Sequence, residues 1–244
     1  MDPTRFLPFV STVVTLTFAG LVIARYASRG GTHHLLWGIG LLWYALGTGS
    51  EAFLSLAYSP WVLKAWFLAG AMLTAAWLGQ GTLFLLVRRR WLTWGTLGLL
   101  VLASAAATLV LLASPVTAGT YQVTLPASGQ YSQLLTSPPG LILLTILLNL
   151  YGTVLLVGGA LLSAWLFWRK QILAHRVLGN ILIAVGAFFP ALAGTSLKLG
   201  LVDWLYVSEL AGSVVMYLGF LVATSGASMR PPTEGIPAPS EAGR

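Results

Sequence analysis

Two glutamates, Glu51 and Glu209, stand alone inside long apolar stretches of the chain. A carboxylate within a membrane span costs about 2.5–3.5 kcal/mol on insertion scales, so such a residue is expected to have a function or a partner. A carboxylate that is shielded from water can bind a cation or take up protons. The chemistry that these two residues suggest is therefore the binding of a small cation or of protons.

Helical spacing places aromatic residues on the same faces as the two glutamates. Tyr44 precedes Glu51 by seven residues, so both lie on one side of a helix. Tyr206 precedes Glu209 by three residues and shares its face in the same way. Trp66 lies on a third apolar stretch, on a face that also carries small and polar residues. We expect these five side chains to line a polar pocket that opens outward.

Two lysines offer another explanation for the same glutamates. Lys64 and Lys198 lie at the same predicted depth as Glu51 and Glu209, and opposite charges attract strongly away from water. In this alternative the four residues form ion pairs that lock helices together. Both lysines therefore belong to the candidate ligand-binding residues.

The chain shows no motif typical of catalysis or of a bound cofactor. It contains no cysteine, which excludes thiolate chemistry, iron–sulfur clusters and cysteine zinc sites. His33 and His34 are adjacent, so we expect their side chains to diverge on a helix, and no nearby carboxylate completes a metal site. We expect no catalytic residue, no metal and no cofactor, and the sequence favours a protein that is not an enzyme.

Composition indicates the elements that position these residues. Hydrophobic residues make up 57% of the 244 residues and charged residues 8%, against about 45–50% and about 25% in soluble proteins. This excludes a soluble enzyme, a disordered chain and a nucleic-acid-binding domain. A helix needs about 20 apolar residues to cross a bilayer, and its backbone groups must pair internally. We predict an all-α polytopic membrane protein with seven transmembrane helices, at about residues 6–24, 35–58, 61–87, 92–114, 140–168, 177–196 and 202–225.

Basic residues indicate the orientation of the chain. With the N-terminus outside, ten of the 13 Lys and Arg residues lie on the cytoplasmic side, and the opposite orientation inverts this ratio. Arg outnumbers Lys ten to three in a chain rich in Ala, Gly and Leu, which is typical of GC-rich bacterial genes. We therefore predict a multi-pass protein of a bacterial inner (plasma) membrane, with the N-terminus outside and the C-terminus in the cytoplasm.

The predicted chain has one folded domain and a tail. Residues 1–228 form the seven-helix transmembrane domain. Residues 229–244 contain several Pro and Gly residues with two acids and few apolar side chains, so we expect a disordered cytoplasmic tail.

Short matches at a spacing near 141 residues suggest an internal duplication. They would superpose the first three helices on the last three in parallel orientation, with the fourth as a connector, which is a 3+1+3 repeat. The matching residues are common types, so a chance origin stays open. The matches are Thr12-Val13 with Thr153-Val154, His34 and Gly38 with His175 and Gly179, and Leu68-Ala69-Gly70 with Leu210-Ala211-Gly212.

An uncharged connection, residues 115–139, joins the fourth and fifth predicted spans on the outer side. Alternating residues on both sides of Pro126 and Gly129 predict a short β-hairpin over residues 120–134, lying across the outer mouth. A plain surface loop is the alternative.

Three functions are compatible with these features. The first is an integral membrane protein that binds or transports a small molecule or ion in the outward-facing pocket, as a transporter or a sensor. The second is a non-catalytic membrane subunit whose polar residues serve helix packing and assembly. The third and weaker one is a membrane-embedded lipid-modifying enzyme. The expected partners are membrane lipid and a small-molecule or ion ligand, without nucleic acid, and the sequence identifies no protein partner.

Overall fold

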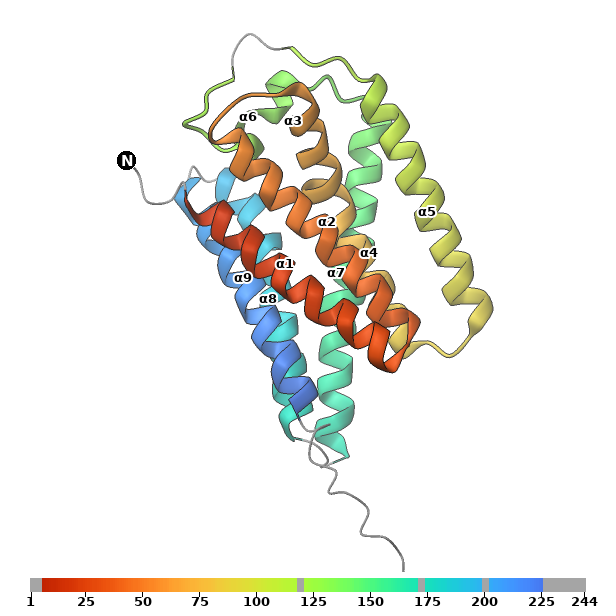
Figure 1. The fold of residues 1–244 in the computed structure, drawn as a ribbon. Coiled ribbons are helices and arrows are strands. Elements are labelled where there is room, and N and C mark those ends of the chain that lie inside the picture. Colours follow the sequence, from red (N-terminus) through yellow and green to blue (C-terminus); the bar gives the residue numbers. More distant parts are fainter. Residues whose placement is uncertain (1–5, 118–120, 171–173, 199–201, 226–244) are drawn as a thin grey trace, which may run out of the picture.

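The computed structural model shows helices that run side by side between two ends of the molecule (Figure 1). It describes residues 6–117, 121–170, 174–198 and 202–225, without the side chains of residues 174 and 191–203. Within these ranges the chain is all-helical, as predicted, and its β contact is an isolated bridge between Val116 and Leu135. The described elements are α1 (Leu7–Arg29), α2 (Thr32–Leu54), α3 (Pro60–Trp66), the π-helix η2 (Phe67–Leu73), α4 (Thr74–Leu86), α5 (Arg90–Ala113), α6 (Ala127–Leu134), α7 (Pro139–Arg169), α8 (Ala174–Lys198) and α9 (Val202–Ser225).

Five of the described helices are long and apolar enough to cross a membrane. They are Leu7–Arg29, Pro60–Leu86, Arg90–Ala113, Pro139–Arg169 and Trp204–Ser225. The second of these combines α3, η2 and α4 into one continuous helix. Helices α2 and α8 occupy the two other predicted spans, and in α8 the described apolar stretch is the shorter segment His175–Pro190. The prediction of seven spans therefore stays a prediction for these two helices.

Six long helices form a closed ring, and a seventh lies outside it. α2 packs between α1 and α4, and α8 packs between α7 and α9. The ring closes where α4 contacts α7 and where α1 contacts α9. α5 touches the ring only lightly, and its large apolar side chains are mostly exposed (Figure 1). That exposure is typical of a helix surface that faces lipid.

Glycines allow the helices of the ring to approach closely. In α7, a Cβ atom on Gly152 would lie 2.1 Å from the carbonyl carbon of Ala75 in α4. Gly79 faces the same crossing, where a Cβ atom built on it would lie 2.8 Å from the Cα of Gly152. Small residues at such contacts let the two backbones pack directly, as membrane helices require in the absence of a hydrophobic driving force.

The π-helix η2 leaves a carbonyl group that a neighbouring helix satisfies. Asn149 of α7 donates its side-chain N–H to the carbonyl of Ala71 at 2.6 Å. Thr74 donates its hydroxyl to the carbonyl of Ala69 at 2.8 Å, five residues earlier. Because an unpaired backbone group is costly in an apolar medium, these two side chains stabilise the irregular turn.

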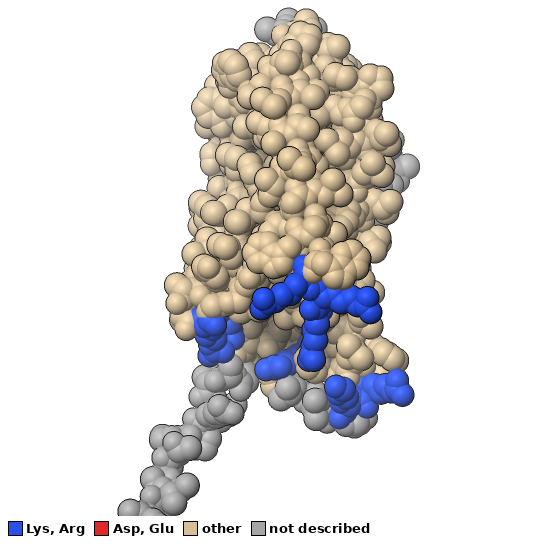
Figure 2. Space-filling view, turned by 90° about the vertical axis from the view of Figure 1, so that its right-hand side faces the viewer, with Lys and Arg blue, Asp and Glu red and all other residues tan. Residues whose placement is uncertain are grey.

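Basic side chains gather at one end of the molecule. Figure 2 shows Lys and Arg at the lower end of the viewed face, and uncharged residues over the rest of that face. This end contains the last turn of α1, the start of α5 and the last turn of α7, which carry Arg29, Arg90 and Arg169. We name it the basic end, and the opposite one the loop end, because it carries α6 and the connection between α5 and α7.

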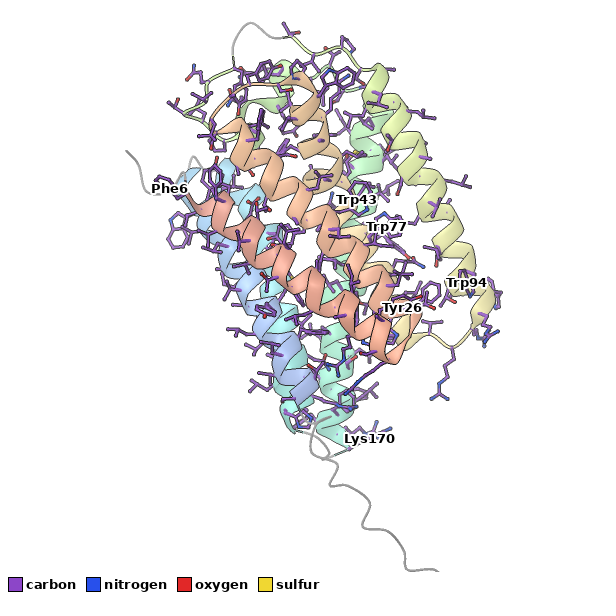
Figure 3. All side chains as sticks on the ribbon, in the orientation of Figure 1. Phe6, Tyr26, Trp43, Trp77, Trp94 and Lys170 are labelled. Carbon is purple, nitrogen blue, oxygen red and sulfur yellow. The ribbon has the colours of Figure 1, made fainter. Side chains whose placement is uncertain are left out.

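Exposed tryptophans mark both ends of the bundle. Trp61 and Trp204 lie towards the loop end, and Trp91, Trp94 and Trp168 lie towards the basic end. Figure 3 shows Trp94 and Lys170 at the basic end and Trp43 and Trp77 midway between the ends. Aromatic side chains at two levels are typical of a protein whose ends reach the two membrane–water interfaces.

Two predictions about local structure are wrong. Residues 127–134 form the helix α6 instead of the second strand of a β-hairpin, because Gln130 bonds the preceding loop and draws the chain into a turn. The side chains of His33 and His34 do not diverge, since their ring centroids lie 4.0 Å apart. The Nδ1 of His34 lies 2.9 Å from the carbonyl oxygen of Gly30, which holds that ring at the start of α2.

The crossing of α4 and α7 yields a test of this packing. We expect Gly152→Ala to destabilise the protein by about 1–3 kcal/mol or more, since the added methyl group would overlap the backbone of Ala75. The thermal midpoint of the purified protein in detergent measures the effect. Gly158→Ala is the matched control, because a Cβ there meets nothing within 4 Å. Equal midpoints for both variants would contradict the close crossing.

Candidate functional site

Glu51 is the centre of a buried polar cluster near the loop end. It lies in the last turn of α2 and is 2% exposed. Its Oε2 atom accepts a hydrogen bond from the Nε1 of Trp66 at 3.3 Å. Its buried Oε1 atom has no hydrogen-bond partner among the described residues. The backbone N–H of Ala127, the first residue of α6, faces the carboxylate, as is favourable for an anion at a helix N-terminus.

Glu209 of α9 lies close enough to Glu51 for the charges of the two carboxylates to interact. Its Oε2 atom is buried and has no hydrogen-bond partner in the described part of the chain. Tyr44 connects the two helices, because its hydroxyl donates to the backbone carbonyl of Glu209 at 2.9 Å. The structure therefore brings Glu51, Glu209, Tyr44 and Trp66 into one region of the bundle, and their role as a ligand site stays a prediction.

Of the three other predicted residues, Lys64 lies elsewhere, Tyr206 is buried in α9, and the side chain of Lys198 is outside the description. Lys64 turns towards α5, where its Nζ donates to the carbonyl of Leu112 at 2.8 Å and lies 5.3 Å from the ring centroid of Trp61. Its ammonium group is thus bound to a carbonyl and an aromatic face, and it does not lock Glu51 in an ion pair. Tyr206 is buried beside Leu205 in α9. The side chain of Lys198 lies outside the described residues.

Aromatic residues in the connection between α5 and α7 cover the cluster, and we name this cover, residues 121–134, the roof. They were not among the residues predicted for the site. The ring of Tyr131 in α6 lies 5.8 Å from that of Trp66 and 5.3 Å from that of Phe67, between centroids. Tyr121 stacks on Tyr58 at 4.8 Å and donates its hydroxyl to the carbonyl of Leu54 at 2.9 Å. The available signal was the presence of two tyrosines and three glutamines in a connection without charge.

The side chain of Gln130 bonds three backbone groups within the roof. Its side-chain oxygen accepts from the backbone N–H of Gln122 at 3.0 Å. Its side-chain N–H groups donate to the carbonyls of Gln122 at 2.8 Å and of Leu125 at 2.9 Å. One buried amide thereby satisfies three backbone groups of an otherwise irregular segment.

Tyr121 reports the electrostatic environment under the roof. Burial, followed by the negative charges of Glu51 and Tyr58, raises the pKa of Tyr121 to about 12. The phenol therefore stays protonated at ordinary pH, and its hydroxyl remains a donor to Leu54. No cationic side chain faces Glu51 among the described residues, so the field at this site is negative.

The cluster can bind a positive species between its two acids. Each carboxylate keeps one buried oxygen without a partner, and phenol and indole groups surround them. Like charges at short distance repel strongly in a medium of low dielectric constant. A proton shared by the carboxylates, or a small cation between them, removes that repulsion and occupies the free oxygens.

A cavity lies on the basic side of this cluster and is built from different residues. It is a largely apolar cavity among α1, α2, α4, α7, α8 and α9, lined by Phe18, Leu41, Leu156 and Phe220 among others. None of the seven predicted site residues lines it. The apolar cavity and the cluster of acids are therefore separate features of the bundle.

Comparison with known proteins adds no assignment. The chain matches no family model, no curated protein and no solved structure. The function is therefore argued from the geometry alone.

The bonds of Gln130 lead to a prediction about the roof. We expect Gln130→Leu to loosen the outer connection, because three backbone groups lose a partner and each such bond contributes about 0.5–1.5 kcal/mol. Backbone amides of residues 121–138 should then exchange with deuterium at least about tenfold faster.

Gln133→Leu is the matched control for this experiment, since Gln133 lies one turn later in α6 and is exposed. The control should leave the exchange rates near those of the unaltered protein. Faster exchange in both variants, or in neither, would show that Gln130 does not fasten the roof.

Proposed function

We propose that this chain is a membrane protein that binds protons or a small cation between Glu51 and Glu209, as a transporter or a sensor. The observation that carries the proposal is that two buried acids from different helices lie within the range at which their charges interact, each with a buried oxygen that has no partner in the described residues. In this view Tyr44 and Trp66 position the carboxylates, and the roof formed by α6 separates them from the outer water.

A bound cation would connect the two halves of the bundle. Glu51 lies in α2 of the first half and Glu209 in α9 of the second. With the site empty, repulsion between the carboxylates pushes these helices apart, while a bound positive charge draws them together. Occupancy thus biases the contact of α2 with α9, and such a bias is what a transporter or a sensor needs.

In the proposed topology all seven long helices cross the membrane, with the N-terminus outside. The concentration of Lys and Arg at one end supports this orientation (Figure 2), because cytoplasmic ends carry an excess of these residues. The 3+1+3 repeat is part of the proposal. If α1 is equivalent to α7, and α4 to α9, then the contact of α4 with α7 is equivalent to the contact of α9 with α1, and the chain has both contacts.

Single cysteines test the orientation, because the natural chain has none. We expect a membrane-impermeant maleimide to label Ser132→Cys, in the exposed face of α6, on intact cells. Ser28→Cys, exposed near the end of α1, should react only after the cells are permeabilised. Labelling of both variants, or the reverse pattern, on intact cells would contradict the proposed orientation.

Substitution of the acids tests cation binding. For the unaltered protein in detergent we expect lower pH, or NaCl or KCl against choline chloride, to raise the thermal midpoint by a few degrees. A gain of 1 kcal/mol shifts the midpoint by about 2–4 °C in a chain of this size. Glu51→Gln and Glu209→Gln should each remove this dependence and leave the protein folded, because a neutral amide relieves the repulsion permanently.

Glu234→Gln is the control for the loss of one acid, since Glu234 lies far along the chain from both site residues. It should keep the dependence on pH and salt. Proteoliposomes loaded with a pH-sensitive dye then separate the two roles. Proton uptake that Glu51→Gln abolishes supports a transporter, whereas binding without uptake supports a sensor.

The packing role of a non-catalytic subunit is the second candidate, and one observation favours it. Glu51 contacts both Trp66 and the first N–H of α6, so the acid can serve to hold the roof. In that case Glu51→Gln should lower the thermal midpoint and loosen α6, and the response of the protein to protons and salt should stay as before. That outcome would reject cation binding.

A further inference from the structure

The apolar cavity among the six ring helices has the composition of a site for a hydrocarbon chain. The cavity proper has a volume of about 60 Å³, and it lies within a wider apolar space of about 590 Å³ that includes open surroundings. Its wall includes side chains from both halves of the ring, namely Phe18, Leu41, Leu78, Leu156, Met216 and Phe220. Such a wall offers contacts to methylene groups and almost no hydrogen bonds.

A small polar group interrupts this apolar wall. Thr82 is already bonded, since it accepts from the Nε1 of Trp37 and donates to the carbonyl of Leu78, both at 3.3 Å. Asn180 and Ser163 also line the cavity, and neither forms a hydrogen bond with another described residue. Two free polar side chains beside an apolar space are typical of a site for a molecule with both kinds of surface.

Two arginines stand on the helix faces that line this cavity. Arg25 follows Val22 and Phe18 on one face of α1, at steps of three and four residues, and both of these residues line the cavity. The guanidinium of Arg25 lies 5.7 Å from the ring centroid of Phe220, which is another wall residue. Arg25 is therefore held at the basic end of the cavity by contact with its wall.

Arg176 of α8 lies at the same end, with its guanidinium 5.7 Å from the ring centroid of Phe167 in α7. It precedes Asn180 by four residues and Ile183 by seven, and both of these line the cavity. The charges of Arg176 and Arg29 act on Arg25 as repulsive neighbours. No acidic side chain compensates them in the described part of the chain, because Glu51 and Glu209 lie towards the loop end. Among the described residues, the basic edge of the cavity thus has no negative partner.

We propose that the cavity and its two arginines form a binding site for an anionic phospholipid. One acyl chain occupies the apolar space, and the phosphate lies between Arg25 and Arg176, with Asn180 and Ser163 near the glycerol oxygens. The guanidinium group binds phosphate oxygens in a planar, two-bond geometry. Basic pockets between membrane helices at the cytoplasmic side recognise anionic head groups in this way. In the proposed orientation the lipid comes from the inner leaflet.

A lipid at this position would touch helices of both halves of the ring. Phe18 and Leu41 belong to the first half, and Leu156, Met216 and Phe220 to the second. The site is separate from the acids at the loop end, so lipid binding and cation binding fail or succeed in independent experiments.

Brominated lipids test the proposal through Trp37, which lines the cavity. The probes are phosphatidylglycerol and phosphatidylcholine with identical dibrominated acyl chains, added to the full-length protein in neutral detergent. The component of fluorescence that Trp37→Phe removes is the signal of the site. We expect the anionic lipid to quench this component at a concentration at least about tenfold lower than the zwitterionic lipid.

Charge variants separate a built site from general attraction. The double variant Arg25→Gln, Arg176→Gln should lose the preference for phosphatidylglycerol. The double variant Arg89→Gln, Arg169→Gln removes the same charge from the same end and should keep this preference, because it leaves Arg25 in place against the wall residue Phe220. An equal loss in both double variants would overturn the proposal in favour of diffuse electrostatics.

Filling the cavity tests the place of the acyl chain. Ala160→Leu and Ser163→Leu each add bulk to the wall and should reduce quenching of Trp37 while both arginines remain. Two variants protect the test against a failure of one of them to fold. Unchanged quenching in the folded variants would overturn the proposal. Inorganic phosphate would also overturn the proposal if, at the concentration of the lipid, it prevented the quenching of Trp37. The site would then bind the free anion.

Discussion

Backbone N–H and C=O groups find no water in the hydrocarbon core of a bilayer, and each must be paired within the protein. This requirement explains why the apolar stretches of the chain become helices in the described structure. It also explains the contacts at the irregular turn η2, where Asn149 and Thr74 bond carbonyls that the π-helix leaves available. The polar residues within the bundle are thus used first to complete the backbone, and only the remainder are available for chemistry.

The regular part of the fold could be predicted from the sequence for the same reason. The seven expected ranges coincide with long helices, because apolar length alone specifies them. The meeting of Glu51 with Trp66 and of Tyr44 with Glu209 followed from helical spacing and a common depth. The helix α6 could not be predicted, since it is supported by the bonds of Gln130 to three backbone groups of the preceding irregular segment, which no local pattern announces. The direction of Lys64 was equally hidden, because the carbonyl of Leu112 that binds it comes from another helix.

The two ends of the bundle differ in charge and in the kind of space that they enclose. Near the loop end, acids with free oxygens lie under an aromatic roof. Near the basic end, guanidinium groups stand beside an apolar hollow. Both arrangements bridge the same two sets of helices, α1 to α4 and α7 to α9. A change in the contact between these sets would therefore alter the geometry of both arrangements, because the same rigid helices contribute to each of them.

The peripheral helix α5 has a consequence for the sense in which the chain is threaded. After three long helices the chain is at the end opposite to the one where α1 begins. A fourth long helix returns it to the end where α1 begins. Because α5 supplies that fourth pass, α7 starts at the same end as α1, and both finish among the arginines (Figure 1). The two sets of helices consequently present equivalent ends at the loop end and at the basic end of the bundle. Because four long helices precede α7, the two sets of helices run in the same direction and the two ends of the molecule differ. Two sets that ran in opposite directions would make the two ends alike.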